Sequence, residues 1–135
     1  PLSVSKAIEG FPGLSGAGSI NFHSSEGWPW SGLRPSGFSD KRWLFDLELI
    51  PASGYMVKGI YGPLLNQMSF KQALRRRNIK PFTVFVDCLK DARIPKEKCS
   101  IPGKTRIFSI SPVDFTIQFR QYFLPYLVAH QASRQ

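Results

Sequence analysis

Apolar and polar positions alternate in three short stretches of this chain, and each stretch predicts a β-strand. Residues 42–50 alternate in part, which predicts a strand with Asp46 and Glu48 on its solvent-facing side. Apolar runs at 81–89 and 105–110 predict two more strands. A long polar segment separates these two runs, so we expect a pair of strands joined by an extended loop.

Apolar residues recur at helical spacing in two further segments. The first segment predicts a helix over 63–78, because Pro63 suits a first turn. Its predicted apolar stripe consists of Leu64, Met68, Ala73 and Leu74. The Ser-Pro-Val-Asp sequence at 111–114 is typical of a helix start. We expect that helix to continue to about residue 130, with a kink at Pro125 because proline removes a backbone hydrogen bond.

The first 39 residues are rich in glycine, serine and proline and predict a loop, apart from a short helix over 3–9. Several aromatic rings in this loop are unlikely to stay in water, which predicts packing on a larger body: Phe11, Phe22, Trp28, Trp30 and Phe38. Residues 55–60 are ambiguous. The pattern as a whole predicts an α+β fold in a single incomplete domain, with a loop-rich part at 1–39 and a strand and helix part at 40–135.

The charge of the chain narrows the classes of partner. The 135 residues carry a net charge of +9, with a pI of about 10.0, which favours a polyanion. A hydrophobic content of 42% argues against disorder. No apolar run has the length of a transmembrane helix and no signal peptide opens the chain. The start at Pro1 suggests a piece of a longer polypeptide, and two isolated cysteines suggest a reducing compartment.

Most of the candidate chemistry lies in the segment 90–106. It holds six cations against two acids: Lys90, Arg93, Lys96, Lys98, Lys104 and Arg106. Like charges at this density repel one another, and a bound polyanion would offset the repulsion. Two rigid strands would fix the direction in which such charges point, and the loop between them would let the charges surround phosphates. The alternative is a solvated hairpin with no ligand.

Other motifs give weaker signals. The Gly-Lys-Thr at 103–105 is not a P-loop, because Lys98 stands where the motif needs glycine and a strand pattern follows. Histidines and cysteines lack the spacing of metal ligands, and no serine is marked as a nucleophile, so we assign neither a metal site nor a catalytic residue. The arginines at 75–77 favour a solvated helix end, with a secondary contact to a nucleic-acid backbone as the alternative.

Two stretches together resemble a known family. KDAR at 90–93, followed by GKTR at 103–106 and an apolar pair, resembles motif F of viral RNA-dependent RNA polymerases of the picorna-like group, in particular those of dicistroviruses and iflaviruses. SSEGWPW at 24–30 is similar to motif G of the same enzymes, and the two motifs occur in the family's order. The resemblance covers most of the chain.

This resemblance implies a part of the fingers subdomain of a right-hand polymerase, a strand–basic loop–strand unit followed by a kinked helix. It implies nucleotide-binding roles for Lys90, Arg93, Lys104, Arg106 and Phe108, with Lys104 and Arg106 as the main triphosphate contacts and Phe108 packing on the templating base. It implies RNA-binding roles for Ser24, Ser25, Gly27, Pro29, Lys96 and Lys98. Ala92 stands where the family usually has a glutamate that orients the arginine of motif F, so Asp91 or Glu97 substitutes or this copy is impaired.

The catalytic palm motifs of the family, including GDD, do not occur in this sequence. We therefore expect the chain alone to be inactive, and the Mg²⁺ ions of the parent enzyme to be held by ligands outside it. The expected partners are template RNA, nucleoside triphosphates, and the palm and thumb of the same polyprotein, at replication complexes in the host cell cytoplasm. The alternatives are a non-catalytic RNA-binding module, an integrated viral remnant, or a generic basic oligonucleotide-binding domain.

Overall fold

A computed structural model describes residues 1–14, 16–51, 54–89 and 107–133. These described residues form two antiparallel strand pairs, three α-helices and two short 3₁₀ helices. In chain order they are α1 (Val4–Glu9), η1 (Trp30–Leu33), η2 (Lys41–Leu44), β1 (Phe45–Ile50), β2 (Gly54–Ile60), α2 (Gly62–Arg76), β3 (Val86–Leu89), β4 (Ile107–Ile110) and α4 (Val113–Ser133). The described chain therefore has the α+β composition that the sequence predicted.

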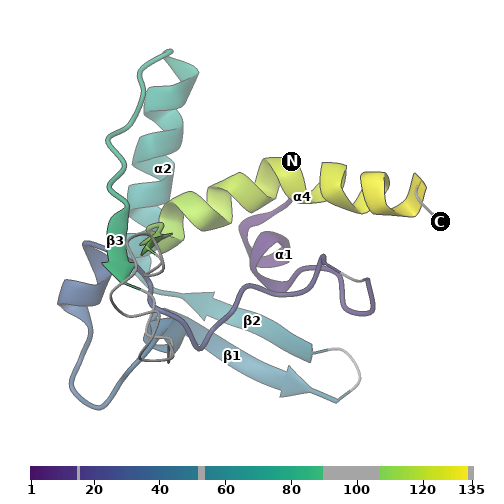
Figure 1. Cartoon of the computed structure of the whole chain (residues 1–135), viewed down its shortest axis with the longest axis horizontal. Helices are drawn as coiled ribbons and strands as arrows, with labels where there is room; N and C mark the ends of the chain where they lie inside the picture. The colour runs from purple at the N-terminus through teal and green to yellow at the C-terminus, as the bar shows by residue number, and fades with distance from the viewer. Residues whose placement is uncertain (15, 52–53, 90–106, 134–135) are drawn as a thin grey trace, which may run out of the picture.

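The elements gather around the first turns of two helices. Figure 1 shows α1 lying between α4 and the β1–β2 hairpin, with α2 rising from the side where α4 begins. The chain start runs along α4, where the Leu2 amide donates to the Gln121 carbonyl at 2.9 Å. The core forms where these elements meet: Ala7, Ile8, Ile20, Phe22, Trp30, Leu44, Phe45, Leu64, Met68, Val113 and Ile117.

The two strand pairs differ from the predicted strands at their edges. The strand predicted at 42–50 begins only at Phe45, because Lys41–Leu44 forms η2, which Asp40 caps through the Arg42 amide at 3.1 Å. The ambiguous stretch 55–60 belongs to β2. The strand predicted over 81–89 covers only Val86–Leu89. Proline at its start lacks an amide donor, which weakens strand pairing there.

The helices agree more closely with the sequence pattern. Ser3 caps α1 by accepting the Lys6 amide at 3.2 Å. The α2 helix has its proline in the first turn, and Leu64 and Met68 are buried, but Ala73 is exposed and the predicted stripe is wrong at that position. The α4 helix contains Pro125, and its ribbon changes direction along its length in Figure 1. No helix of the described chain is long and apolar enough to cross a membrane.

The loop-rich first part of the chain packs mainly on the chain itself. Phe22 is 2% exposed and meets the rings of Phe45 and Tyr55 edge to face, with centroids 5.7 and 5.0 Å apart. Trp30 is likewise buried, whereas Trp28 and Phe38 are each 51% exposed. The prediction that all these rings need a larger body is therefore wrong for the two buried ones, since the hairpin and the helix starts supply their core.

Candidate RNA and nucleotide interface

The β3–β4 pair agrees with the prediction of two strands joined by a basic segment. Val86 pairs with Ile110 and Leu89 with Ile107 in an antiparallel register, so residues 90–106 join the ends of two paired strands, as predicted. The Ser109 hydroxyl donates to the Asp87 carboxylate at 2.5 Å across the pair. The predicted cations of the loop lie outside the described residues: Lys90, Arg93, Lys96, Lys98, Lys104 and Arg106.

A groove of about 620 Å³ brings together residues of both predicted motifs. Phe108 of β4 lines it and is 45% exposed. Ser24 and Ser25 line the same groove from the loop after Phe22. Residues that are distant in sequence and were assigned separately to template and to nucleotide thus face one space.

The two serines are held in place by short-range hydrogen bonds. The Ser24 hydroxyl donates to the Asn21 carbonyl at 3.0 Å, and the Ser24 carbonyl accepts the Lys41 amide at 3.3 Å. The Ser25 hydroxyl accepts the Gly27 amide at 3.2 Å. Such bonds fix the course of a loop, so this wall of the groove has a defined shape.

Gly27 sets how closely this loop approaches the start of α4. Its φ is +79°, and a Cβ there would lie 2.6 Å from the Ser111 carbonyl oxygen and 2.8 Å from the Pro112 Cα. Only glycine accommodates both the positive φ and this contact. The predicted close-approach glycine is therefore buried against the chain's own backbone.

A buried carboxylate anchors the same loop. The Glu26 side chain is 0% exposed, and its Oε2 accepts the Arg34 Nε at 3.1 Å and the Trp43 indole N–H at 2.5 Å. Arg34 also donates through Nη2 to Oε1, so the guanidinium binds in a two-pronged arrangement. Burial alone raises the pKa of Glu26, but the bonds from Arg34 and Trp43 outweigh it and leave the pKa below its usual range.

A second buried carboxylate joins the other elements. Asp114 in the first turn of α4 is 0% exposed and accepts the Trp30 indole N–H at 3.1 Å and the Lys71 ammonium at 2.7 Å. The acid expected at a helix start is present, but its side chain is turned inward to η1 and α2. Asp114 thus ties Trp30, the last residue of the motif G stretch, to α2 and α4.

Two further cations line the groove that the serines and Phe108 share. Lys41 is 8% exposed, and burial lowers the pKa of its ammonium although Glu26 and Asp40 act in the opposite direction. Arg120 donates to the Ala7 carbonyl at 2.6 Å and the Gly18 carbonyl at 2.5 Å, and burial lowers its pKa. Arg120 thus braces the first loop, whereas Lys41 adds positive charge to the groove wall.

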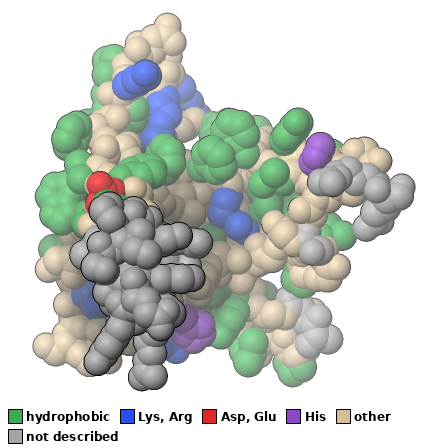
Figure 2. Space-filling model, viewed as in Figure 1, with side chains coloured by type: hydrophobic (Ala, Val, Ile, Leu, Met, Phe, Trp, Pro, Cys, Tyr) green, Lys and Arg blue, Asp and Glu red, His purple; other side chains and the backbone are tan. Residues whose placement is uncertain are grey.

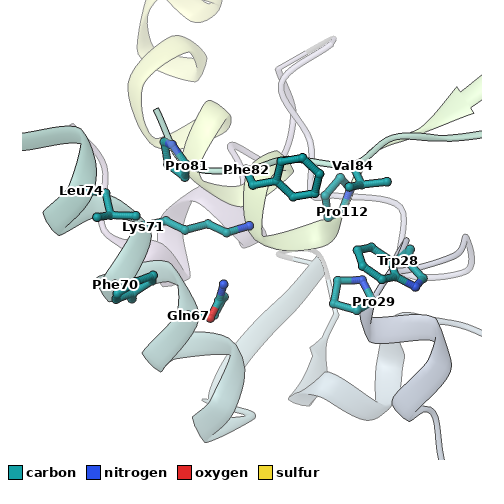
Figure 3. A pocket seen from close by; sticks show the side chains of 10 residues that line it. All are labelled: Trp28, Pro29, Gln67, Phe70, Lys71, Leu74, Pro81, Phe82, Val84 and Pro112. Carbon is teal, nitrogen blue, oxygen red and sulfur yellow. The ribbon is translucent and has the colours of Figure 1, made fainter. Parts of the chain in front are cut away.

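The other motif G residues face a different cavity. Trp28 and Pro29, joined by a cis peptide bond, line a space of about 310 Å³ beside α2. Figure 3 shows Lys71 reaching from α2 into this space, with Phe70 next to it on the same helix and Phe82 and Pro112 on the side opposite α2. Of the predicted RNA-contacting residues that the structure describes, Ser24 and Ser25 thus line one cavity and Pro29 lines another.

The arginines at the end of α2 have different surroundings. Arg75 donates to the Gln118 side chain of α4 at 2.5 Å and is half-buried, so the solvated interpretation is wrong for this residue. Arg76 and Arg77 are exposed. Figure 2 shows cationic side chains along α2 and hydrophobic side chains gathered over α4.

Groups suited to a metal ion do not gather in the part of the chain that the structure describes: no three His, Cys, Asp or Glu side chains could share one ion there. His23 lies 3.8 Å from the Asp40 carboxylate at an exposed site. Asp40 is engaged by Arg42, whose hydrogen bonds and charge lower the pKa of that carboxyl. Among the described carboxylates, the buried ones of Glu26, Asp40 and Asp114 are thus occupied by cations and indoles of the chain itself.

Comparison with known proteins identifies the family. The sequence profile described as viral RNA-dependent RNA polymerase matches residues 2–135. The chain belongs to this polymerase family. The genome polyprotein of Deformed wing virus is 52% identical over 132 residues, which cover 98% of this chain and 5% of that polyprotein. The replicase polyprotein of Acute bee paralysis virus is 34% identical over 134 residues, which cover 96% of this chain and 6% of that polyprotein.

The fold also matches a solved viral polymerase. The Sicinivirus 3Dpol RNA dependent RNA polymerase superposes with a TM-score of 0.64 at 23% identity, covering 95% of this chain and 23% of that chain. The family predicted from motifs F and G is therefore confirmed, with relatives among picorna-like insect viruses. The chain corresponds to one region of a polymerase and spans only about 5% of the polyproteins that it matches. The family uses RNA and nucleotides as substrates and depends on divalent metal ions in general.

Sequence reasoning missed several residues that shape the groove. Glu26 occupies the variable position of motif G, Asp114 was interpreted as an ordinary helix-start acid, and Lys41 lies just before the strand predicted at 42–50. Local patterns carry no signal of burial for a single charged residue. A buried tryptophan needs a partner for its indole N–H, and this need is a signal from which a buried carboxylate could have been predicted.

Proposed function

We propose that this chain is a fingers region of an RNA-directed RNA polymerase and that it binds template RNA and the incoming nucleoside triphosphate. The observation that carries the proposal is the groove shared by Ser24, Ser25 and Phe108. Template steering and base packing were assigned to these residues on separate motifs, and a strand of RNA must meet both at once. Lys41 adds a cation on the wall of the same groove.

The chemistry asked of this region is electrostatic. Charge on a triphosphate must be balanced while the phosphoryl group is transferred, and fixed cations do this without reorganisation. We assign this role to Lys104 and Arg106, with Lys90 and Arg93 assisting or touching the template. The β3–β4 pair supports the proposal because it gives the segment that holds these cations a paired base.

The divalent ion of the complete enzyme, which we take to be Mg²⁺, would neutralise charge on the triphosphate when bound. Its ligands are proposed to lie in the palm, outside this chain, because the palm motifs such as GDD do not occur in this sequence and no three ligating side chains gather among the described residues. The role of this chain is then to position template and nucleotide next to the metal-binding part, and alone it should synthesise no RNA.

The proposed partners follow from this role. They are template RNA, nucleoside triphosphates, and the palm and thumb of the same polyprotein, with Lys96 and Lys98 as additional backbone contacts for RNA. In this proposal Gly27 lets the backbone of the template-facing loop pack closely on the start of α4, and Pro29 stiffens the same loop. The proposed location is the host cell cytoplasm, at viral replication complexes.

The test compares two exposed phenylalanines in the complete polymerase. Phe108→Ala removes the ring from the groove, and loss of a base–aromatic contact worth about 1–3 kcal/mol should lower single-turnover incorporation at limiting RNA by roughly 10- to 100-fold. Phe38→Ala removes a ring that is 51% exposed on the loop before η2 and should leave the rate within about twofold. Equal rates for the two variants would contradict the proposal.

A further inference from the structure

The loop proposed to steer the template contains a charged residue, Glu26, whose side chain is buried in the protein. Ser24, Ser25 and Pro29 are accessible at the surface, but the Glu26 side chain is 0% exposed. Its carboxylate accepts bonds from Arg34, from the indole of Trp43 and, at 3.4 Å, from the Ser25 hydroxyl. Both oxygens are therefore used inside the protein and none remains for a ligand.

Burying a charge has to be offset by specific partners. An isolated carboxylate in a low-dielectric interior is costly, and the cost is recovered only with close ion pairing and full hydrogen bonding. Here a guanidinium binds both oxygens and an indole N–H completes the set. Such an arrangement tolerates little displacement, so it holds the backbone of residue 26 in one place.

The backbone of Glu26 connects this anchor to the strand that carries Phe108. The Glu26 carbonyl accepts the amide of Val113, the first residue of α4, at 2.8 Å. The next residue, Gly27, rests on Ser111 and Pro112 at the link between β4 and α4. The position of Ser24 and Ser25 relative to Phe108 is thus set through residue 26.

We propose that Glu26 is a positioning residue whose buried carboxylate, held by Arg34 and Trp43, sets the width of the groove between Ser25 and Phe108 and thereby the affinity for template RNA. This inference rests on the proposed function. It predicts an effect on template binding that exceeds the effect on nucleotide binding, because the carboxylate is joined directly to the serine wall.

The test uses the complete polymerase and three variants. Glu26→Gln keeps the size of the side chain but presents an amide N–H to donors that need an acceptor. Trp43→Phe removes the indole donor and keeps a smaller aromatic ring facing Tyr61, whose centroid lies 5.2 Å from that of Trp43. The matched control is Glu48→Gln, since Glu48 is a half-exposed carboxylate paired with Lys58 at 3.0 Å on the β1–β2 hairpin.

Steady-state extension of a primed RNA gives KM for template and KM for nucleotide, and thermal unfolding gives Tm for each variant. Glu26→Gln should raise the template KM by about tenfold, consistent with the large rate effects of small misplacements. The nucleotide KM should stay within about twofold, and Trp43→Phe should change the template KM in the same direction by about threefold. Glu48→Gln should match the unsubstituted enzyme in both constants.

A lower Tm with an unchanged template KM would overturn the proposal, because a purely structural role changes stability alone. Equal rises in both KM values would overturn it as well. If Glu26→Gln does not fold, the template KM of Trp43→Phe decides. Extension of primed RNA by the unsubstituted polymerase is measured before any variant is compared. Failure of that extension would refute the proposed function itself.

Discussion

Removal of the Asp114 carboxylate should destabilise the junction of α2 and α4 more than any exposed charge change. The Lys71 and Asp114 side chains are 11% and 0% exposed, and their ion pair measures 2.7 Å. Asp114→Ala leaves the ammonium of Lys71 without its partner in a nearly dry site. It also leaves the indole N–H of Trp30 without its acceptor, which lay 3.1 Å away.

The magnitude follows from these two losses. Breaking a buried ion pair from one side costs about 3–5 kcal/mol, and an unsatisfied buried indole adds roughly 1 kcal/mol. We therefore expect local stability to fall by about 4–6 kcal/mol, which corresponds to roughly a 10³- to 10⁴-fold change in an opening equilibrium. The exposed pair between Glu48 and Lys58 sets the comparison, because Glu48→Ala should cost about 1 kcal/mol or less.

Amide hydrogen exchange in the complete polymerase measures this change directly. Amides of the first turns of a helix exchange by local opening, so Asp114→Ala should accelerate those of α4 by about three to four orders of magnitude. The pair Asp114→Asn and Lys71→Met together removes both charges and keeps an oxygen for Trp30, and should return exchange to within about tenfold of the unsubstituted protein. Equal protection in Asp114→Ala and Glu48→Ala, or a double variant as labile as Asp114→Ala, would refute this reasoning.

Further outcomes follow from the charges and the exposed surface. In the complete polymerase, Arg106→Ala should depress nucleotide incorporation at saturating RNA by about 10²-fold, whereas Arg76→Ala should only weaken RNA affinity and reduce the salt slope by about one; equal catalytic damage would reject the assignment. Because the pKa of Glu26 lies below its ordinary value of 4.5, its contribution to stability is complete above about pH 4.5 and is lost as pH falls through the lowered pKa, so Tm measured against pH should decline in acid and decline less in Glu26→Gln. The chain on its own should bind a hydrophobic dye such as ANS through α4, where Phe123 is 49% and Tyr126 is 65% exposed, and a monodisperse chain without dye binding would contradict this. Its affinity for single-stranded RNA should fall with salt at a log–log slope of about −3 to −4, and a flat response would leave the basic segment without an RNA role.

The sequence alone determined the elements whose signals are local. The Ser-Pro-Val-Asp start of α4, the capping serine of α1 and the proline in the first turn of α2 each act through neighbouring backbone groups, and all three helices form where predicted. The antiparallel pair around residues 90–106 was also predicted, because apolar runs on both sides of a polar loop have few other ways to pair. Motifs F and G were enough to predict the family.

Only the tertiary structure decided which polar residues are buried and which predicted site residues share a surface. Glu26 and Asp114 look like ordinary acids in the sequence, and their burial depends on an indole and a cation supplied from other elements. Trp30 and Asp114, for example, lie 84 residues apart. The meeting of Ser25 with Phe108, and the separation of Pro29 onto another cavity, have the same origin. Periodicity reports how one segment divides between core and solvent, whereas a buried charge is stable only when several distant segments bring its partners together.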